Sequence, residues 1–216
     1  MSEEPLHVLV RVWLPDRPGA LGLVASRIGA VDGDIVGIDV LEHGDGIAVD
    51  EFAVLLRRSV SLDLLVREIL EVDGTSVEQV RTIEHFPDPR LDALESAASL
   101  ASAGSAPELQ QVLVDHIRGE FLADWSVLVS SGAVLTTAGE PTMEYSMIEA
   151  LVAGFAASPR VADGTTGPDD LALAALPEHD SVLLVSRAGH SFRRRERAQL
   201  LALAGIADRL WSLVTP

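Results

Sequence analysis

The residues best suited to binding chemistry lie in one short stretch, Asp16-Arg17-Pro18-Gly19-Ala20-Leu21. The apolar run before it predicts a strand over residues 7–13, and the apolar spacing after it predicts one buried face of a helix over residues 19–30. Pro18 is tolerated at a helix start, and Gly19 lets the backbone approach another group closely. Because the free N–H groups of a helix N-terminus attract carboxylates and other anions, this turn is a candidate anion-binding site.

A second candidate is the pair Asp34 and Ile35, where the sequence predicts that the next strand begins. An amino-acid ligand carries a carboxylate and an ammonium group close together, so its site needs N–H donors for the first and an acid or carbonyls for the second. The turn at residues 16–21 supplies the donors, and Asp34 is the candidate acid. The alternatives remain open that the hexapeptide only starts a helix and that Asp34 is only a turn residue.

The elements that must position these residues form a regular series. Gly and Asp at residues 43–46 predict a hairpin turn, and Ser61 can cap a helix that ends near Gly74. The predicted strands cover residues 7–13, 35–41, 47–56 and 77–83. The order βαββαβ is the ferredoxin-like arrangement of the α+β class, in which two helices cover one face of a sheet.

Within this order, the turn at Asp16, Arg17, Pro18, Gly19, Ala20 and Leu21 resembles the D-x-P-G-x-L turn of the ACT family of small-molecule-binding regulatory domains. The resemblance extends over nearly all of residues 6–84. It implies an amino-acid effector bound at this turn and near Asp34 and Ile35. It also implies a homo-oligomer, at least a dimer, with effector sites at the shared interface. Many ACT domains have asparagine at the position of Asp34, and the acid here favours a ligand ammonium or a basic side chain.

The second half of the chain has a different pattern. Two prolines within residues 85–90 predict the end of the first domain at residue 86 and a linker over residues 87–90. The pattern of residues 91–216 predicts helices first and a long helix last. Between them it predicts strand pairs around 125–137 and 171–187 and an irregular loop over 158–170. This order of apolar segments is similar to a GAF domain, a sensor fold with a central antiparallel sheet. The resemblance implies a GAF-like α/β domain over residues 91–216.

Composition excludes several classes of function. The net charge of −17 argues against nonspecific binding to nucleic acid or anionic lipid. The sequence has no cysteine and no lysine, which excludes disulfides, thiolate nucleophiles, Schiff-base chemistry and a Walker-type phosphate lysine. We expect no signal peptide, because the start Met1-Ser2-Glu3-Glu4 is acidic and no apolar segment of the signal-peptide type follows it, and no apolar run is long enough for a membrane helix. We therefore expect a cytoplasmic protein without a membrane or nucleic-acid partner.

No catalytic motif is evident in the sequence. Glu178-His179-Asp180 is either part of a metal site or a polar turn, and the basic cluster Arg193–Arg197 is either a nucleic-acid contact or a salt-bridged helix start. We expect a stand-alone regulatory protein rather than an enzyme, with no cofactor or metal and with an unidentified protein partner as its output. The alternative is a ligand-free scaffold that assembles through both domains.

Overall fold

The computed structural model describes residues 4–156 and 170–214. The chain divides into two compact units, Met1–Phe86 and Pro87–Pro216, and each is described by itself. None of the helices in the described part of the chain combines the length and the apolar character that a membrane span requires.

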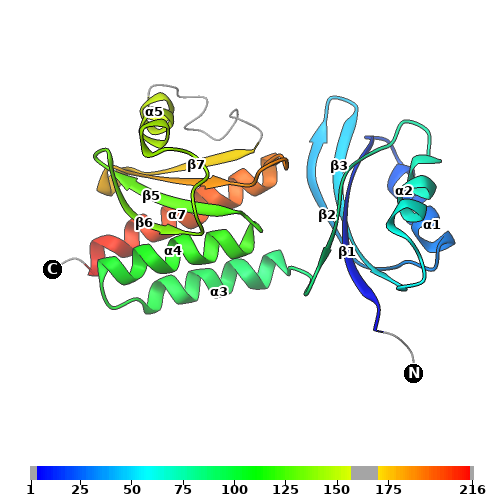
Figure 1. The fold of residues 1–216 in the computed structure, drawn as a ribbon, viewed down its shortest axis with the longest axis horizontal. Coiled ribbons are helices and arrows are strands. Elements are labelled where there is room, and N and C mark those ends of the chain that lie inside the picture. Colours follow the sequence, from blue (N-terminus) through cyan, green and yellow to red (C-terminus); the bar gives the residue numbers. More distant parts are fainter. Residues whose placement is uncertain (1–3, 157–169, 215–216) are drawn as a thin grey trace. The chain divides into compact units, whose positions relative to one another are not determined.

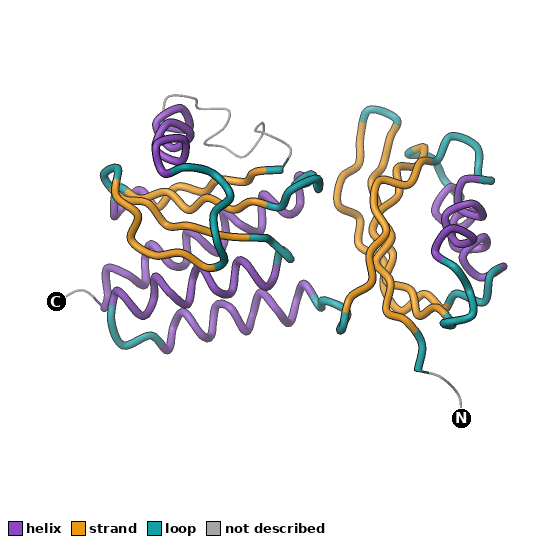
Figure 2. Tube along the Cα trace, in the orientation of Figure 1, coloured by secondary structure: helices purple, strands orange, loops and turns teal. Residues whose placement is uncertain are grey.

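The N-terminal unit is one antiparallel sheet with two helices on one face (Figures 1 and 2). The strands lie in the order β2-β3-β1-β4. Alternate residues of β1 and β3, such as Val10 and Phe52, point toward the helices and form the core. The element order βαββαβ expected from the sequence is observed: β1 (Leu6–Pro15), α1 (Ala20–Ala30), β2 (Asp34–Gly44), β3 (Ile47–Leu56), α2 (Leu62–Leu70) and β4 (Ser76–Ile83).

Local signals in the sequence explain the ends of these helices. Asp32 adopts a left-handed conformation with φ 58° after α1, and the N–H of Gly33 donates to the Ile28 carbonyl at 3.0 Å. A Cβ at Gly33 would lie 2.8 Å from that carbonyl oxygen, so this position requires glycine. Ser61 caps α2 as predicted, because its hydroxyl accepts from the N–H of Leu64 at 3.2 Å. Helix α2 ends at Leu70, four residues earlier than the sequence suggested.

The C-terminal unit also contains an antiparallel sheet, with strand order β6-β5-β8-β7. Helices α4 and α7 cover one face, with α3 packed against both of them, and α5 covers the other face (Figure 1). In chain order the elements are α3 (Pro89–Ser102), α4 (Ala106–Glu120), β5 (Trp125–Ser130), β6 (Ala133–Ala138), α5 (Tyr145–Ala156), β7 (Leu171–Leu176), the short 3-10 helix η1 (Pro177–His179), β8 (Ser181–Ser186) and α7 (Arg194–Val214). The irregular loop expected over residues 158–170 lies, except for Asp170, outside the described residues.

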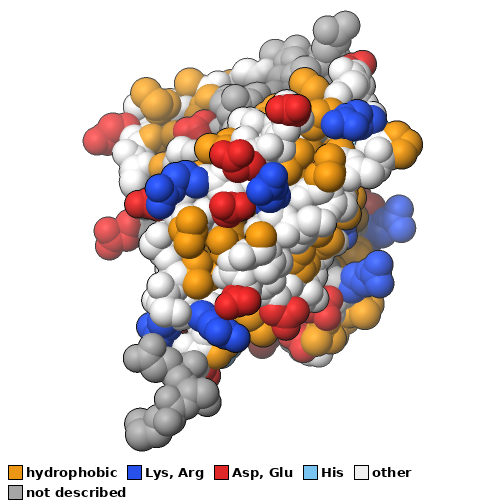
Figure 3. Space-filling view, turned by 90° about the vertical axis from the view of Figure 1, so that its right-hand side faces the viewer, with side chains coloured by type: hydrophobic (Ala, Val, Ile, Leu, Met, Phe, Trp, Pro, Cys, Tyr) orange, Lys and Arg blue, Asp and Glu red, His pale blue; other side chains and the backbone are white. Residues whose placement is uncertain are grey.

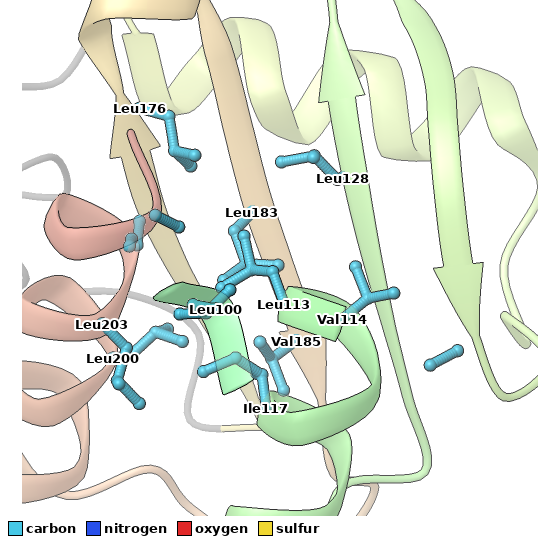
Figure 4. Packing of buried hydrophobic residues seen from close by; sticks show 14 of the residues in the cluster. Leu100, Leu113, Val114, Ile117, Leu128, Leu176, Leu183, Val185, Leu200 and Leu203 are labelled. Carbon is cyan, nitrogen blue, oxygen red and sulfur yellow. The ribbon is translucent and has the colours of Figure 1, made fainter. Parts of the chain in front are cut away.

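Burial of both sheet faces explains why the middle of each central strand, Val127–Val129 in β5 and Val182–Val185 in β8, is an unbroken apolar run. Leu128 and Leu183 point into the cluster shared with α3, α4 and α7, to which Leu113 and Leu200 also belong (Figure 4). Trp125 and its alternate neighbours belong instead to a second cluster on the α5 side. The fold as a whole is therefore α+β with two antiparallel sheets.

Helix α3 begins at Pro89, inside the segment that the sequence suggested as a linker. The Asp88 carboxylate accepts hydrogen bonds from the N–H groups of Arg90 and Leu91, each at 3.1 Å. Proline is well tolerated at the first helical position because its missing N–H has no partner there in any helix. The prolines that were expected to exclude a helix thus mark the start of one.

Candidate functional site

The turn between β1 and α1 is held by backbone hydrogen bonds. The N–H of Asp16 donates to the Gly46 carbonyl at 3.0 Å, which joins the turn to the tip of the β2–β3 hairpin. Within the turn, the N–H of Ala20 donates to the Arg17 carbonyl at 3.2 Å. Residues 16–19 are exposed at the surface. The structure therefore places the residues from Asp16 to Leu21 together at one end of the sheet.

The N-terminus of α1 lacks the usual compensation for its positive end. Its N-cap is Gly19, no side chain among the described residues caps it, and no acid lies in its first turn. Gly19 has a φ of 89°, and a Cβ there would have nothing within 4 Å. An anion can thus approach the first N–H groups of α1 without meeting a side chain of the N-cap residue.

Asp34 and Ile35 lie at the opposite end of the sheet from this turn. Asp34 is in register with Leu55 of β3, whereas Pro15, just before the turn, is in register with Ile47. At about 3.3 Å per residue the two ends are roughly 25 Å apart. One copy of the chain therefore does not bring Asp34 and the turn to a common ligand. Ile35 packs against the core of the unit.

A different acid, which the sequence analysis did not single out, lies at the same end as the turn. Asp50 is in register with Val12 of β1 and alternates with Ala48 and Phe52, so it points to the helix-covered face. Its exposed fraction is 2%, and its Oδ1 atom has no hydrogen-bond partner. Ala20, the first residue of α1, is buried in the same core, so α1 begins over this end of the sheet.

The electrostatic environment of Asp50 is unfavourable to its charge. Burial raises the pKa of the Asp50 carboxyl above its ordinary value, and the negative charge of Asp16 raises it further. The alternation in β3 could have shown that position 50 is buried, but acids in such patterns are usually exposed. Asp50 thus combines burial, an unsatisfied oxygen and nearness to the turn.

The edge strand β2 exposes a row of aliphatic side chains. Ile38 and Val40 are in register with Phe52 and Asp50 and so share the helix-covered face, yet they are 39% and 43% exposed. Figure 3 views the N-terminal unit from the side of α1 and α2, where hydrophobic side chains reach the surface between acidic and basic ones. A long edge strand with exposed apolar side chains is a surface suited to pairing with another strand.

In the C-terminal unit, Glu178-His179-Asp180 is a polar turn attached to α7. His179 contacts Asp208, and the hydroxyl of Ser212 donates to the Glu178 carboxylate at 3.1 Å. Within residues 4–156 and 170–214, no group of His, Asp and Glu side chains could hold a metal ion. The polar-turn interpretation therefore accounts for these residues.

The basic cluster at residues 193–197 begins helix α7. The Glu196 carboxylate accepts from the N–H of Arg193 at 2.8 Å and lies 2.8 Å from the guanidinium of Arg187. Arg187 is buried, and its guanidinium also stacks 4.3 Å from the centroid of Phe192. These contacts are those of a salt-bridged helix start.

A polar network joins the three helices on one face of the C-terminal sheet. The hydroxyl of Ser96 donates to Glu120 at 2.9 Å and lies 3.2 Å from Nδ1 of His116, and the Gln199 amide donates to the other oxygen of Glu120. Burial raises the pKa of Glu120, and the hydrogen bonds from Ser96 and Gln199 only partly oppose this.

No family model matches the chain, and no curated protein matches it. Three solved structures are similar at low TM-scores. The ACT domain of GTP pyrophosphokinase from Chlorobium tepidum is 20% identical, with a TM-score of 0.29 over 38% of this chain and 90% of that chain. The bacteriophytochrome RpBphP3 from R. palustris is 8% identical, with a TM-score of 0.43 over 81% of this chain and 42% of that chain.

The third structure, an unknown protein from Galdieria sulphuraria, is 13% identical, with a TM-score of 0.35 over 97% of this chain and 95% of that chain. With TM-scores this low, the three likenesses do not assign the chain to a family.

Proposed function

We propose that the N-terminal unit is a regulatory domain that binds an amino acid at the start of α1. The observation that carries this proposal is the uncapped N-terminus of α1, which begins at Gly19 with open space beside it. Its N–H groups and positive dipole are suited to the ligand carboxylate. The resemblance of residues 16–21 to the ACT turn supports the same assignment.

The proposal includes assembly of two copies through the edge strand β2. Antiparallel pairing of β2 with its copy, about a two-fold axis at Asp39, would bury the exposed Ile38 and Val40. The same pairing would place Asp34 beside Gly44 of the second copy. Because Gly44 begins the hairpin turn that is bonded to Asp16, Asp34 would then approach the site of the other copy.

Ligand binding would act by favouring one arrangement of the two copies, because only a ligand that contacts the arrangements differently shifts their equilibrium. We propose that the C-terminal unit, GAF-like in its order of elements, passes this change to a protein partner. A ligand-free scaffold is the second candidate, and the exposed row on β2 favours it equally well.

A thermal-shift screen of the twenty amino acids on the full chain separates the two candidates. Selective binding to the folded state raises the melting temperature. A ligand at a concentration of one hundred times its dissociation constant stabilises the folded state by about 2.7 kcal/mol. Regulation by an amino acid predicts a shift for one amino acid or a few related ones. The Arg17→Glu variant, which places an acid at an exposed position beside the start of α1, should lose that shift, whereas Ala30→Glu, at the exposed other end, should keep it. A screen without any shift contradicts the proposal.

A further inference from the structure

The strongest feature that this function leaves unexplained is the uncompensated charge of Asp50. A buried carboxylate normally has a cation or several hydrogen-bond donors around it, because removal from water without such partners is costly. Asp50 is 2% exposed, and its Oδ1 atom has no partner. Both side chains next to it on the same face of β3, Ala48 and Phe52, are apolar.

The position of Asp50 relates it to the start of α1. It lies one row inward along β3 from Ala48, which is in register with Leu14 near the end of β1. The chain turns at Asp16 directly after this strand end, and the charge of Asp16 acts on Asp50. The first turn of α1, which begins over this end of the sheet, includes the small residues Ala20 and Gly22.

From this juxtaposition we infer that Asp50 binds the ammonium group of the amino acid whose carboxylate lies at the N-terminus of α1. This inference rests on the proposed function and names the residue that recognises the amino group. The ammonium supplies the missing partner of Oδ1 and neutralises the buried charge, so it gains more from Asp50 than from an exposed acid. Asp34, which is exposed in one copy of the chain, contributes less.

The inference makes the site selective for amino acids over the corresponding hydroxy acids. A hydroxyl group in place of the ammonium leaves the Asp50 charge uncompensated in the bound state. Replacement of Asp50 by asparagine, which has almost the same shape, removes the charge and with it the preference for the ammonium. The same replacement should stabilise the free protein, so weaker binding of this variant cannot be attributed to unfolding.

Calorimetry on the full chain tests the inference with four matched pairs of compounds: alanine and lactate, valine and 2-hydroxyisovalerate, aspartate and malate, and phenylalanine and phenyllactate. For the pair whose amino acid binds, Asp50→Asn should raise the dissociation constant of the amino acid by about 10- to 100-fold. The dissociation constant of the hydroxy acid should stay within about twofold. Asp34→Asn should have a smaller effect, and Asp73→Asn, an exposed acid after α2, should have none.

Two failures are distinguishable. If an amino acid binds and Asp50→Asn binds it as tightly as the parent protein does, the inference is wrong and the proposed function stands. A larger loss in Asp34→Asn than in Asp50→Asn likewise overturns the inference alone. If none of the four amino acids binds and none of the twenty shifts the melting temperature, both are wrong.

Discussion

Nδ1 of His179 lies 2.8 Å from Oδ1 of Asp208, and the other oxygen of this carboxylate accepts from the N–H of Glu178 at 3.0 Å. The His179 ring also stacks on Trp211, with ring centroids 4.2 Å apart and planes inclined by 5°. Asp208 and Trp211 are buried residues of α7. The contact therefore fixes η1, and with it the connection from β7 to β8, against the closing helix.

Replacement of Asp208 by alanine should destabilise the C-terminal unit by about 1.5–3 kcal/mol, because it leaves the N–H of Glu178 and the ring of His179 without their acceptor. Urea unfolding followed by far-ultraviolet circular dichroism measures this change. Arg209→Ala, at the exposed next position, should stay within about 0.5 kcal/mol of the parent. Equal effects of the two variants would show that the contact contributes no stability.

The free protein should become more stable at neutral pH when Asp50 is replaced by asparagine. Burial raises the pKa of this carboxyl, so its charged form opposes folding at pH 7. Differential scanning calorimetry should show a higher melting temperature for the variant, with each 1 kcal/mol worth about 4–8 °C in a unit of this size. The difference should shrink as the pH falls through and below about 4, because the carboxyl becomes protonated in the unfolded state as well as in the folded state. A lower melting temperature at pH 7 would contradict this account.

The whole chain should be more stable in mildly acidic solution than at neutral pH. Burial is the largest cause that raises the pKa of Asp50, Asp92 and Glu120. A raised carboxyl pKa adds stability that is complete below the unfolded-state pKa of about 4 and is lost as the pH rises through the folded-state pKa. Thermal unfolding at pH 5 and pH 7 checks the sign. The combined variant Asp50→Asn, Asp92→Asn and Glu120→Gln should show a weaker dependence on pH over this range.

Two glycines with positive φ should respond differently to alanine. Gly19→Ala introduces strain at a φ of 89° but no contact, so a loss of about 1–2 kcal/mol is expected. At Gly139 the φ is 75°, and a Cβ would also lie 2.3 Å from the carbonyl oxygen of Asp124. The loss in Gly139→Ala should therefore be clearly larger, as measured by urea unfolding. Similar losses would mean that the backbone at Gly139 shifts easily.

If β2 pairs with its copy as proposed, substitution of Ile38 by aspartate should convert this dimer to a monomer. The exposed side chain lies on the edge strand β2, and a charge there opposes burial against a second copy. Sedimentation velocity at micromolar concentration measures the mass, which is 23.0 kDa for one chain. Leu213→Asp, at an exposed position of α7, is the matched control and should remain dimeric. A parent protein that sediments as a monomer at these concentrations would contradict the proposed assembly.

The sequence predicted the elements well because their signals are local. Ser61 accepts the capping hydrogen bond expected of it, and β3 covers Ile47–Leu56, as the strand pattern predicted. The order of strands across the sheet and the register between them are not local properties. These decide which candidate residues are neighbours.

The topology expected from the sequence could have corrected one prediction, that Asp34 and the turn at Gly19 share a ligand within one copy. A helix that follows a strand returns the chain to the end where that strand began, so the next strand starts opposite the turn. This argument already separates Asp34 from Gly19 within one copy. The missing hydrogen-bond partner of Asp50 could not be predicted from the sequence for another reason. Whether a buried oxygen has a partner depends on all the side chains that surround it in space.

Helix α7 is the last element of the C-terminal unit in chain order, and this affects how the unit folds. The centre of the second sheet is the pair β5 and β8, and α7 packs on β7, α3 and α4. While the ribosome is still adding Arg194–Val214, the apolar side chains of Leu128 and Leu183 have no complete cover. The N-terminal unit, whose last strand ends at Ile83, has all its elements long before that. We therefore expect it to fold during translation, and the C-terminal unit to stay open to chaperones until its last helix emerges.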